Sequence, residues 1–470
     1  MERAERILDK FKTPDSIVTR KLKLGDRCGT VLYNPDLTDV ATIRAVIFAL
    51  EEKCSRFKSY EEIMQTVLFE CETEIQSDED KCINALVNGD MLFVIDGHDD
   101  CLIINARSYE TRSVMEPPTE TVMRGPREGF IEDIKTNLSL LERRLKTPDL
   151  AIDRMIIGKR TATNIAICYL SSVADPSVVD KIKKRLGKID IDGIVDSHYL
   201  VPYLEDNPLS LFAQVGVSEK PDVVAAKMLE GRVAIIVDGS PMVLTVPFVM
   251  IEDFQSGEDY YQRSSFASML RALRYASLIV ATLLPALYVA LQNFHYTLIP
   301  VRFMMTLMSA IKGLPLSPLA ETVFVLLLFE IIREASVRMP RAVGMAMSIV
   351  GALVLGETAV KAGIISSPAV MIIALSSIAL FTVPNLIGTT SVLRLIYTLV
   401  GGLFGLFGLI LTVLLTLHYI CAMNGYGAPY LAPFAPYVSG DMKDAVGRAP
   451  LVEMNYRPKS IPNINSKRQG

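Results

Sequence analysis

The charged residues of this chain are divided very unequally along its length. Residues 275–420 carry only 11 charged side chains in 146 positions, although the 470-residue chain contains 100. This region also contains uncharged apolar runs of about 20 residues, the length of helix that crosses a bilayer. The sequence therefore predicts an integral membrane protein, in which an α/β soluble N-terminal half is followed by an α-helical polytopic membrane domain.

The first 274 residues contain no apolar run long enough to cross a membrane, and the chain does not open with the apolar core of a signal peptide. The seven cysteines are odd in number and form no Cys-x-x-Cys pair, which is typical of reduced thiols. Because a domain made before the first membrane helix normally folds in the cytosol, we expect the N-terminal half to be cytoplasmic.

Two segments of the N-terminal half share one pattern. Residues 88–97 (NGDMLFVIDG) and 230–239 (EGRVAIIVDG) each contain a glycine, a short apolar run and an Asp-Gly turn. The run is typical of a buried strand, and Asp-Gly of a tight turn. Each segment follows a helical pattern and precedes another apolar run. We therefore predict two related α/β subdomains, at 1–125 and 127–255.

The sequence offers little for catalysis or cofactor binding. It has no Walker loop, Gly239-Ser240 is not part of a nucleophile elbow, and His98 and His198 each lack a second ligand at metal-binding spacing. The net charge of −4 does not favour nucleic acid. We therefore expect no enzymatic activity, no metal, no cofactor and no nucleic-acid partner.

The membrane domain is expected at 275–420, with an approach helix before it and a tail at 421–470 after it. The approach helix, 259–274, is amphipathic and carries Arg263, Arg271 and Arg274, which favours an interfacial position on the cytoplasmic side. In the first span, 275–294, Pro285 should kink the helix and free a carbonyl. Residues 297–311 are short for a membrane span and contain Arg302. The sequence therefore leaves open whether there are five or six spans and on which side of the membrane the tail lies. The last span is expected at 392–420.

The apolar helix 319–339 carries several ionisable side chains. They include Glu321 near its start and the group Glu330, Arg333 and Glu334. Ionisable groups at membrane depth face protein or water rather than lipid, so Glu330 is expected to pair with Arg333 or with another subunit. The alternative is an interfacial helix whose charged end is solvated.

Small residues mark positions of close helix packing, and one helix carries a stripe suited to a pore. The packing positions are Gly344, Ser348, Gly351, Gly401 and Gly405. The stripe on helix 342–365 consists of Met347, Val350, Val354 and Thr358. Such a stripe could line a pore that closes by dewetting, or it could be an ordinary packed face.

Several ordered sequence blocks between about residues 120 and 450 resemble one known family. They include Arg124-Gly-Pro-Arg-Glu-Gly-Phe130, Glu258-Asp-Tyr-Tyr261, Leu284-Pro-Ala-Leu-Tyr288, Phe329-Glu330, Phe381-Thr-Val-Pro-Asn385 and Pro429-Tyr-Leu-Ala-Pro433. With them the chain resembles the A subunits of GerA-type spore germination receptors, a family that includes the stage V sporulation AF proteins. One departure is Lys220, where the family usually has arginine, and lysine cannot make the same bidentate contacts.

The resemblance implies a multi-pass protein of the spore inner membrane, in contact with lipid. It implies a homo-oligomeric ion channel, with five copies as the expected number, acting with a transporter-like B subunit and a lipoprotein C subunit in a nutrient germinant receptor. The alternative is a non-conducting scaffold or accessory subunit of receptor clusters, similar to the sporulation AF branch.

Overall fold

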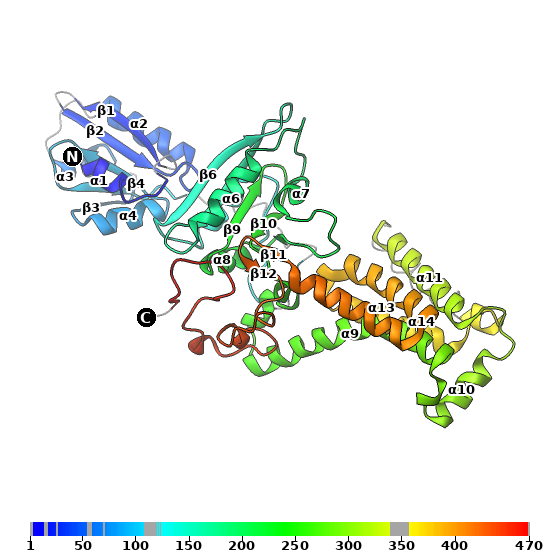
Figure 1. The fold of residues 1–470 in the computed structure, drawn as a ribbon. Helices are drawn as coiled ribbons and strands as arrows, with labels where there is room; N and C mark the ends of the chain where they lie inside the picture. Colours follow the sequence, from blue (N-terminus) through cyan, green and yellow to red (C-terminus); the bar gives the residue numbers. More distant parts are fainter. Residues whose placement is uncertain are drawn as a thin grey trace.

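The computed structural model describes residues 3–13, 17–24, 27–53, 59–68, 71–107, 120, 122, 124–338 and 357–468. Two α/β subdomains follow one another along the N-terminal half, and a bundle of helices extends from the second of them (Figure 1). The C-terminal tail returns from the bundle to the second subdomain. The chain therefore runs outward from the soluble half and back to it.

Subdomain 1 is a five-stranded antiparallel sheet with helices on both faces, in the strand order β1-β2-β4-β5-β3. Its elements are α1 (Arg3–Leu8), β1 (Val18–Leu24), β2 (Arg27–Tyr33), α2 (Val40–Lys53), α3 (Tyr60–Thr66), β3 (Thr73–Gln76), α4 (Glu79–Val87), β4 (Met91–Ile95) and β5 (Cys101–Ile104).

Subdomain 2 is a second five-stranded antiparallel sheet, in the order β6-β7-β9-β10-β8. Its elements are α5 (Ile134–Glu142), β6 (Leu150–Ile157), β7 (Thr163–Leu170), α6 (Pro176–Leu186), α7 (Val201–Leu204), β8 (Gly216–Ser218), α8 (Pro221–Leu229), β9 (Val233–Val237) and β10 (Val243–Val246). Strand for strand, this is the order of subdomain 1.

The repeat seen in the sequence lies at the centre of both sheets. The two matched segments contain β4 and β9, and all five residues of each strand are buried. Alternate residues of a strand point to opposite faces, so Phe93 packs with α2 and α3 while Leu92 packs with α1 and α4. The glycines that flank the strands, Gly89 and Gly231, both have a positive φ, at 90° and 105°. The prediction of two related α/β subdomains is confirmed.

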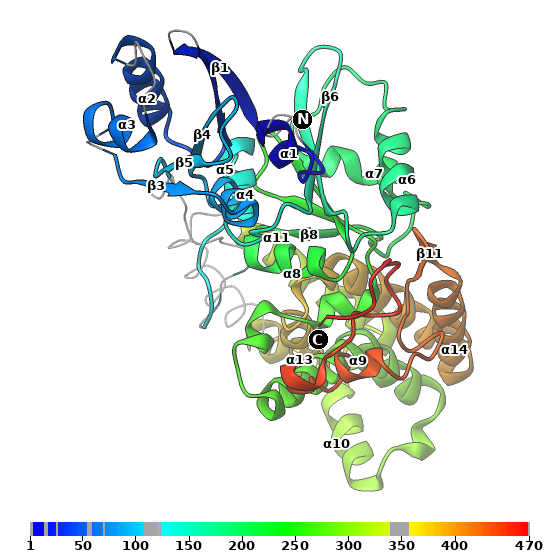
Figure 2. The same ribbon diagram turned by 90° about the vertical axis from the view of Figure 1, so that its left-hand side faces the viewer.

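Two short 3-10 helices, η3 (Met250–Phe254) and η4 (Gly257–Tyr260), connect subdomain 2 to the helical half. The described helices of that half are α9 (Ser264–Phe294), α10 (Val301–Ile311), α11 (Pro318–Arg338), α13 (Ser367–Leu380) and α14 (Ile387–Ala422). Among the described residues, the segments Ser264–Phe294 and Pro384–Ala422 are long and apolar enough to cross a membrane. Figure 2 shows the bundle below the two sheets.

The long helix α14 turns back on itself at Gly405. This residue has φ 65° and ψ −157°, outside the helical region. The side chains of Leu393 and Ile420, 27 positions apart, pack in one apolar cluster. In a straight α-helix they would be separated by about 40 Å. The expected single helix over 392–420 is therefore two antiparallel arms, 387–404 and 406–422, which meet beside Phe294 at the end of α9.

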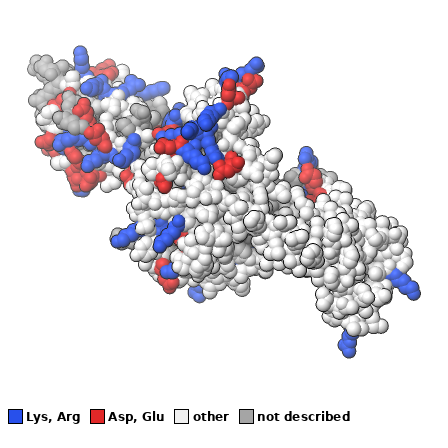
Figure 3. Space-filling model, in the orientation of Figure 1, with Lys and Arg blue, Asp and Glu red and all other residues white. Residues whose placement is uncertain are grey.

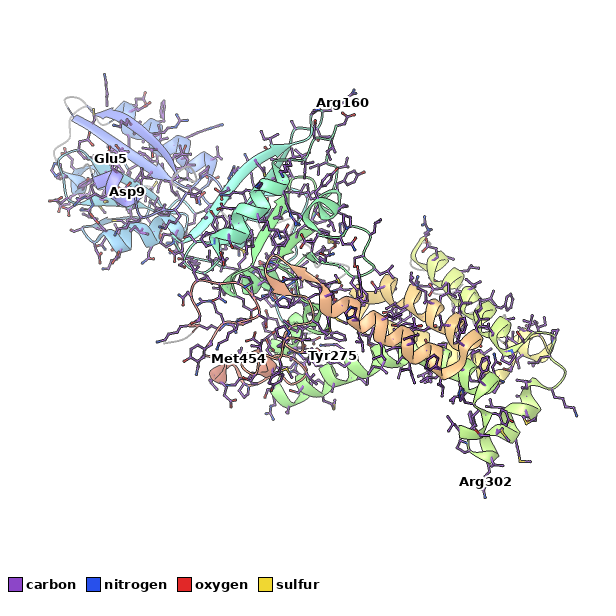
Figure 4. All side chains as sticks on the ribbon, viewed as in Figure 1. Glu5, Asp9, Arg160, Tyr275, Arg302 and Met454 are labelled. Carbon is purple, nitrogen blue, oxygen red and sulfur yellow. The ribbon has the colours of Figure 1, made fainter. Side chains whose placement is uncertain are left out.

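The structure differs from one further expectation for this half and narrows one alternative that the sequence left open. The approach helix and the first span form one continuous helix, α9, rather than two elements. The segment expected at 297–311 forms the 11-residue helix α10, which is about 16 Å long and too short to cross a bilayer. Arg302 of α10 lies at the end of the molecule farthest from the two sheets, whereas Tyr275 lies at the junction (Figure 4).

The charge division of the sequence is visible on the surface. Charged side chains cover the N-terminal subdomains, while the visible face of the bundle is almost free of them apart from basic side chains at its far end and one small mixed group (Figure 3). Large apolar side chains of the bundle, such as Phe404, Phe407 and Leu414, are exposed in the isolated chain. The bundle therefore has the surface of a protein covered by an apolar medium or by further copies.

Candidate functional site

A buried arginine organises the polar interior of the bundle. Arg394, in the first arm of α14, is 2% exposed. Its guanidinium donates to Glu330 Oε1 of α11 at 2.7 Å, and to the hydroxyls of Ser376 and Ser377 of α13 at 3.1 and 3.2 Å. A buried charge of this kind is tolerated only when it is paired and hydrogen-bonded. Arg394 therefore ties three helices together.

Glu330 lies between two arginines. Its second oxygen is 2.5 Å from Arg333 on the same helix, and Arg333 also donates to Ser391 Oγ at 2.9 Å. The cluster of Glu330, Arg333 and Arg394 thus has a formal charge of +1. Glu334 is not part of it, since it pairs with Arg338 at 2.6 Å and both side chains are largely exposed. The structure brings together two of the three residues singled out from the sequence and adds Arg394.

Pro285 of α9 is connected to the same hydrogen-bond network. Pro285 cannot donate to the carbonyl of Ala281, four residues earlier. That carbonyl instead accepts a hydrogen bond from Ser376 Oγ at 2.8 Å. The expected free carbonyl is therefore present, and its partner is the serine that also contacts Arg394. The sequence signal for this network was the presence of isolated polar residues, Ser376, Ser377 and Arg394, in apolar helices.

The predicted packing glycines have different environments. A Cβ on Gly401 would lie 2.9 Å from the carbonyl oxygen of Ala286, so this glycine allows α14 to approach α9 closely. Gly405 is instead the point where α14 reverses. Gly344, Ser348 and Gly351 lie outside the described residues.

The described residues include only one member of the predicted pore stripe, Thr358. Met347, Val350 and Val354 lie outside the described residues, and Thr358 is exposed within a short helical stretch at 357–361. In that stretch Glu357 and Lys361 form an ion pair at 2.5 Å. The pore assignment stays a prediction.

The junction between the soluble half and the bundle is held by buried charges. Arg271 of α9 is fully buried and donates to Asp259 at 2.8 Å and to Asp444 of the tail at 2.7 Å. Arg274 donates to the same Asp259 at 2.8 Å. Burial acts to raise the pKa of Asp259, but the bonds from Arg274 and Arg271 outweigh it and lower the pKa. Arg271 therefore fixes the tail to α9, and Arg274 fixes the segment before α9. The amphipathic pattern had instead suggested that both face lipid headgroups.

The tail also enters the core of subdomain 2. After the second arm of α14 comes a small hairpin of β11 (Asn424–Gly425) and β12 (Ala428–Pro429). At its turn, Tyr426 packs in the core of subdomain 2 and donates to the Leu204 carbonyl at 2.8 Å. Further along, Ile464 N–H donates to the Val173 carbonyl at 3.0 Å, and Arg468 pairs with Glu230 at 2.8 Å. The soluble half therefore consists of residues from both ends of the chain.

One grouping of catalytic residue types occurs in subdomain 2. Ser240 Oγ donates to Asp196 at 2.6 Å, and His198 Nδ1 lies 3.0 Å from the other oxygen of Asp196. The carboxylate lies between the hydroxyl and the imidazole, so the described contacts lack the nucleophile–base pair of a hydrolase. Within the described ranges, no group of three or more His, Cys, Asp or Glu side chains could hold a metal.

Comparisons with known proteins point to one family. A family model described as "Bacillus/Clostridium GerA spore germination protein" matches residues 5–460. "Spore germination protein KA" of Bacillus subtilis is 37% identical and covers 97% of this chain and 85% of its own length. "Spore germination protein A1" of the same organism is 34% identical, with 98% and 95% covered. "Uncharacterized membrane protein YfkQ", also from B. subtilis, is 37% identical, with 96% and 89% covered.

Among solved structures, the crystal structure of the N-terminal domain of the A subunit of the Bacillus megaterium spore germinant receptor GerK3 matches with 28% identity and a TM-score of 0.41. The match covers 53% of this chain and 94% of that domain. Because the family model matches residues 5–460, nearly the whole length of this chain, the chain belongs to the Bacillus/Clostridium GerA spore germination protein family.

Proposed function

We propose that this chain is the A-type subunit of a nutrient germinant receptor, and that copies of it form a ligand-gated ion channel in the spore inner membrane. Relatives named as spore germination proteins, matching over nearly their full length, support the role in germination. Partners in this role are a transporter-like B subunit and a lipoprotein C subunit.

One observation in particular supports the proposal of an oligomeric channel. The side chains of Glu330 and Arg333 are each 27% exposed in the isolated chain, although they belong to an apolar bundle. Charged groups in contact with hydrocarbon are costly, and in membrane proteins they face other protein or a water-filled path. A neighbouring copy or an aqueous pathway therefore covers this side of α11. The same surface would be unfavourable for a single chain surrounded by lipid.

The position of the tail bears on the topology. Tyr426, Ile464 and Arg468 contact subdomain 2, so the tail and the N-terminal half occupy the same side of any membrane that the bundle crosses. The number of crossings is then even. Since α10 is too short to cross, a total of six counts the two arms of α14 as separate spans. With the N-terminal half in the cytoplasm, α10 and Arg302 face the opposite side.

The pore in this proposal is formed by Met347, Val350, Val354 and Thr358. Thr358 is exposed, which leaves it available to a surface shared by several copies. Repeated around an oligomer, the valines would give a dry constriction that excludes ions until it widens.

An ion-flux measurement tests the proposal. The full chain is reconstituted into liposomes loaded with a potassium-sensitive dye. Val350→Ala or Val354→Ala should increase leak, since a smaller side chain weakens the dry barrier. Val392→Ala, at an exposed position on α14, is the matched control and should leave the flux unchanged. Equal flux from all variants would contradict the pore assignment.

A second candidate is a non-conducting scaffold or accessory subunit. The relative named only as an uncharacterized membrane protein is as similar, at 37% identity, as the spore germination protein KA. The level of sequence identity alone therefore does not assign the receptor role to this chain. Liposomes that contain correctly folded protein but show no flux, alone or with the B and C subunits, would favour the scaffold.

A further inference from the structure

A loop of subdomain 2, residues 205–214, reaches the helical bundle with exposed apolar side chains at its tip. The loop connects α7 to β8, and in Figure 1 it lies between α7 and the bundle. Leu209, near its middle, is 93% exposed, the highest value of any large apolar side chain in the described structure, and Leu211 is 44% exposed. An exposed leucine alone is common in soluble proteins, so the surroundings of this loop decide what it does.

Hydrogen bonds within the loop hold its tip in place. Gln214 closes the loop, since its backbone N–H donates to Glu205 Oε1 at 3.0 Å and its side-chain amide donates to the Asn207 carbonyl at 3.2 Å. At the tip, Ser210 N–H donates to the Asn207 carbonyl at 3.1 Å, and Leu209 N–H donates to Asn207 Oδ1 at 3.2 Å. Compact loops of this kind keep their shape through their own contacts. Leu209 is therefore held outward by a loop that is already formed.

Both arms of α14 contact this loop where they meet subdomain 2. Thr389 Oγ1, at the start of the first arm, donates to the Leu211 carbonyl. Near the end of the second arm, the hydroxyl of Tyr419 accepts from Asn207 Nδ2 at 3.2 Å. The ring of Phe212, which is buried, lies 6.2 Å from the ring of Tyr419. The loop is therefore fixed beside the ends of both arms.

The end of the second arm has the features of a membrane–water boundary. Leu414, Leu415 and Leu417 are exposed apolar residues, and Tyr419, which follows them, is 38% exposed. Tyrosine is enriched at the level of the lipid headgroups, where its ring meets apolar groups and its hydroxyl finds a hydrogen-bond partner. Leu415 lies one turn before Tyr419 on the same face of the helix. A loop bonded to Tyr419 thus carries Leu209 at this boundary.

The tip of the loop carries no charge that would oppose contact with lipid. Residues 207–218 contain no Asp, Glu, Lys or Arg. The charge that precedes them, Asp206, forms ion pairs with Arg185 and, at 3.7 Å, with Lys181. An uncharged tip enters a bilayer boundary without the cost of an unpaired charge. A specific contact with another protein would instead bury a broad complementary surface, which a narrow loop does not offer.

We propose that residues 207–213 form a membrane anchor of subdomain 2, in which Leu209 and Leu211 insert between the lipid headgroups and the acyl chains. The partner of this surface is the bilayer itself, and the exposed apolar face of the second arm continues into it. The anchor goes beyond the proposed function, because neither a channel nor a scaffold requires it. It holds the sheet of subdomain 2 to the membrane at a point separate from the covalent connection to α9.

Tryptophan fluorescence of the full chain in lipid nanodiscs tests the anchor. The chain contains no tryptophan, so each substitution introduces a single reporter. Leu209→Trp is measured in phosphatidylcholine nanodiscs with and without bromine atoms on the acyl chains, because bromine quenches a nearby indole ring. We expect quenching that is stronger with bromine near the headgroup than with bromine near the chain end. Leu415→Trp, on the second arm, and Phe48→Trp, exposed on α2 of subdomain 1, are the comparison reporters.

The outcomes separate lipid from the other surroundings. Quenching of Leu209→Trp close to that of Leu415→Trp, with none for Phe48→Trp, supports the anchor. An unquenched Leu209→Trp that emits at the same long wavelength as Phe48→Trp would show that the loop lies in water. An unquenched Leu209→Trp with emission at shorter wavelength would show that protein, such as a second copy of this chain, covers the loop. Either of these two results would overturn the proposal.

A second reporter tests the native leucine, because tryptophan itself favours the membrane boundary. Ala213→Trp is exposed in the same loop and leaves Leu209 in place. Adding Leu209→Asp should reduce the quenching of this reporter severalfold, since a carboxylate is excluded from apolar surroundings. Phe48→Asp is the matched control and should leave it unchanged, and thermal unfolding checks that both variants are folded. Equal quenching of Ala213→Trp with and without Leu209→Asp would contradict the anchor.

Discussion

The carboxylate of Glu330 lies 2.7 Å from the guanidinium of Arg394, although the two residues are 64 positions apart. This ion pair joins α11 to α14 in the interior of an apolar bundle. Because Arg394 is almost completely buried, its charge depends on this contact and on two serine hydroxyls. The pair is therefore a point where the loss of one side chain should affect the whole bundle.

We predict that Glu330→Ala lowers the amount of folded protein in the membrane. Removing one partner of a buried pair leaves an uncompensated charge, at about 3–5 kcal/mol. The measurement is the membrane-embedded, detergent-extractable yield together with the thermal midpoint. Glu334→Ala is the control, because its exposed pair with Arg338 should contribute less than about 1 kcal/mol. Equal effects of the two substitutions would show that the Glu330 contact is not structural.

The reversal at Gly405 gives a second prediction. Its φ of 65° with ψ −157° is accessible essentially to glycine alone, and a Cβ there would lie 3.0 Å from His295 and 3.2 Å from Phe294. Gly405→Ala should destabilise the bundle by about 1–3 kcal/mol. Gly388→Ala, on the same helix with open space around it, should be neutral or slightly stabilising. Thermal unfolding of the two variants in detergent compares them directly, and similar midpoints would contradict the hairpin.

The features that could be predicted from sequence are those with a local signature. The apolar runs of β4 and β9, each bounded by glycine turns, identify the centres of both sheets without any tertiary information. Pro285 likewise identifies a free carbonyl, because the missing N–H is a property of the residue itself. The donor to that carbonyl, Ser376, is 95 residues from Ala281 and has no local signature that connects the two.

The hairpin of α14 was not predicted because residues 395–422, on both sides of the turn, form one run without a charged side chain. No proline or charge marks the turn, and the cluster of glycines around Gly405 is equally typical of close helix packing. The environment of Arg271 was predicted wrongly for a similar reason. Its spacing with Arg263 and Arg274 suits a headgroup-facing helix, but Asp444, 173 residues later, buries it. Long-range partners of this kind cannot be obtained from periodicity.

Labelling of introduced cysteines tests the placement of the tail. Since Ile464 and Arg468 contact subdomain 2, a cysteine at Lys467 should react from the same side as Cys28, which is exposed in subdomain 1. Arg302→Cys, at the far end of the bundle, should react from the opposite side. In intact cells a membrane-impermeant maleimide is expected to label Arg302→Cys alone, in a Cys421→Ser background. Labelling of Lys467→Cys under the same conditions would place the tail outside and imply an odd number of spans.

The contact between the two subdomains should make stability depend on pH. Glu142 of α5 is buried and accepts a hydrogen bond from Asn34 of subdomain 1 at 3.0 Å, and burial raises its pKa to about 8. In the unfolded chain a glutamate titrates near about 4.3. Between these values the folded state holds a proton that the unfolded state releases, so stability falls as pH rises toward 8.

We therefore expect the thermal midpoint of the full chain to fall between pH 6 and pH 8, and Glu142→Gln to reduce that fall. Glutamine keeps an oxygen for Asn34 and cannot ionise, so the variant should be more stable at pH 8, by on the order of 3 kcal/mol. Burial also raises the pKa of Asp36 nearby, which adds a change of the same sign to both proteins. Glu51→Gln, at an exposed glutamate of α2, is the control. If Glu142→Gln shows the same pH dependence as the unmodified chain, the carboxyl is ionised in the folded state, and the contact with Asn34 does not depend on its proton.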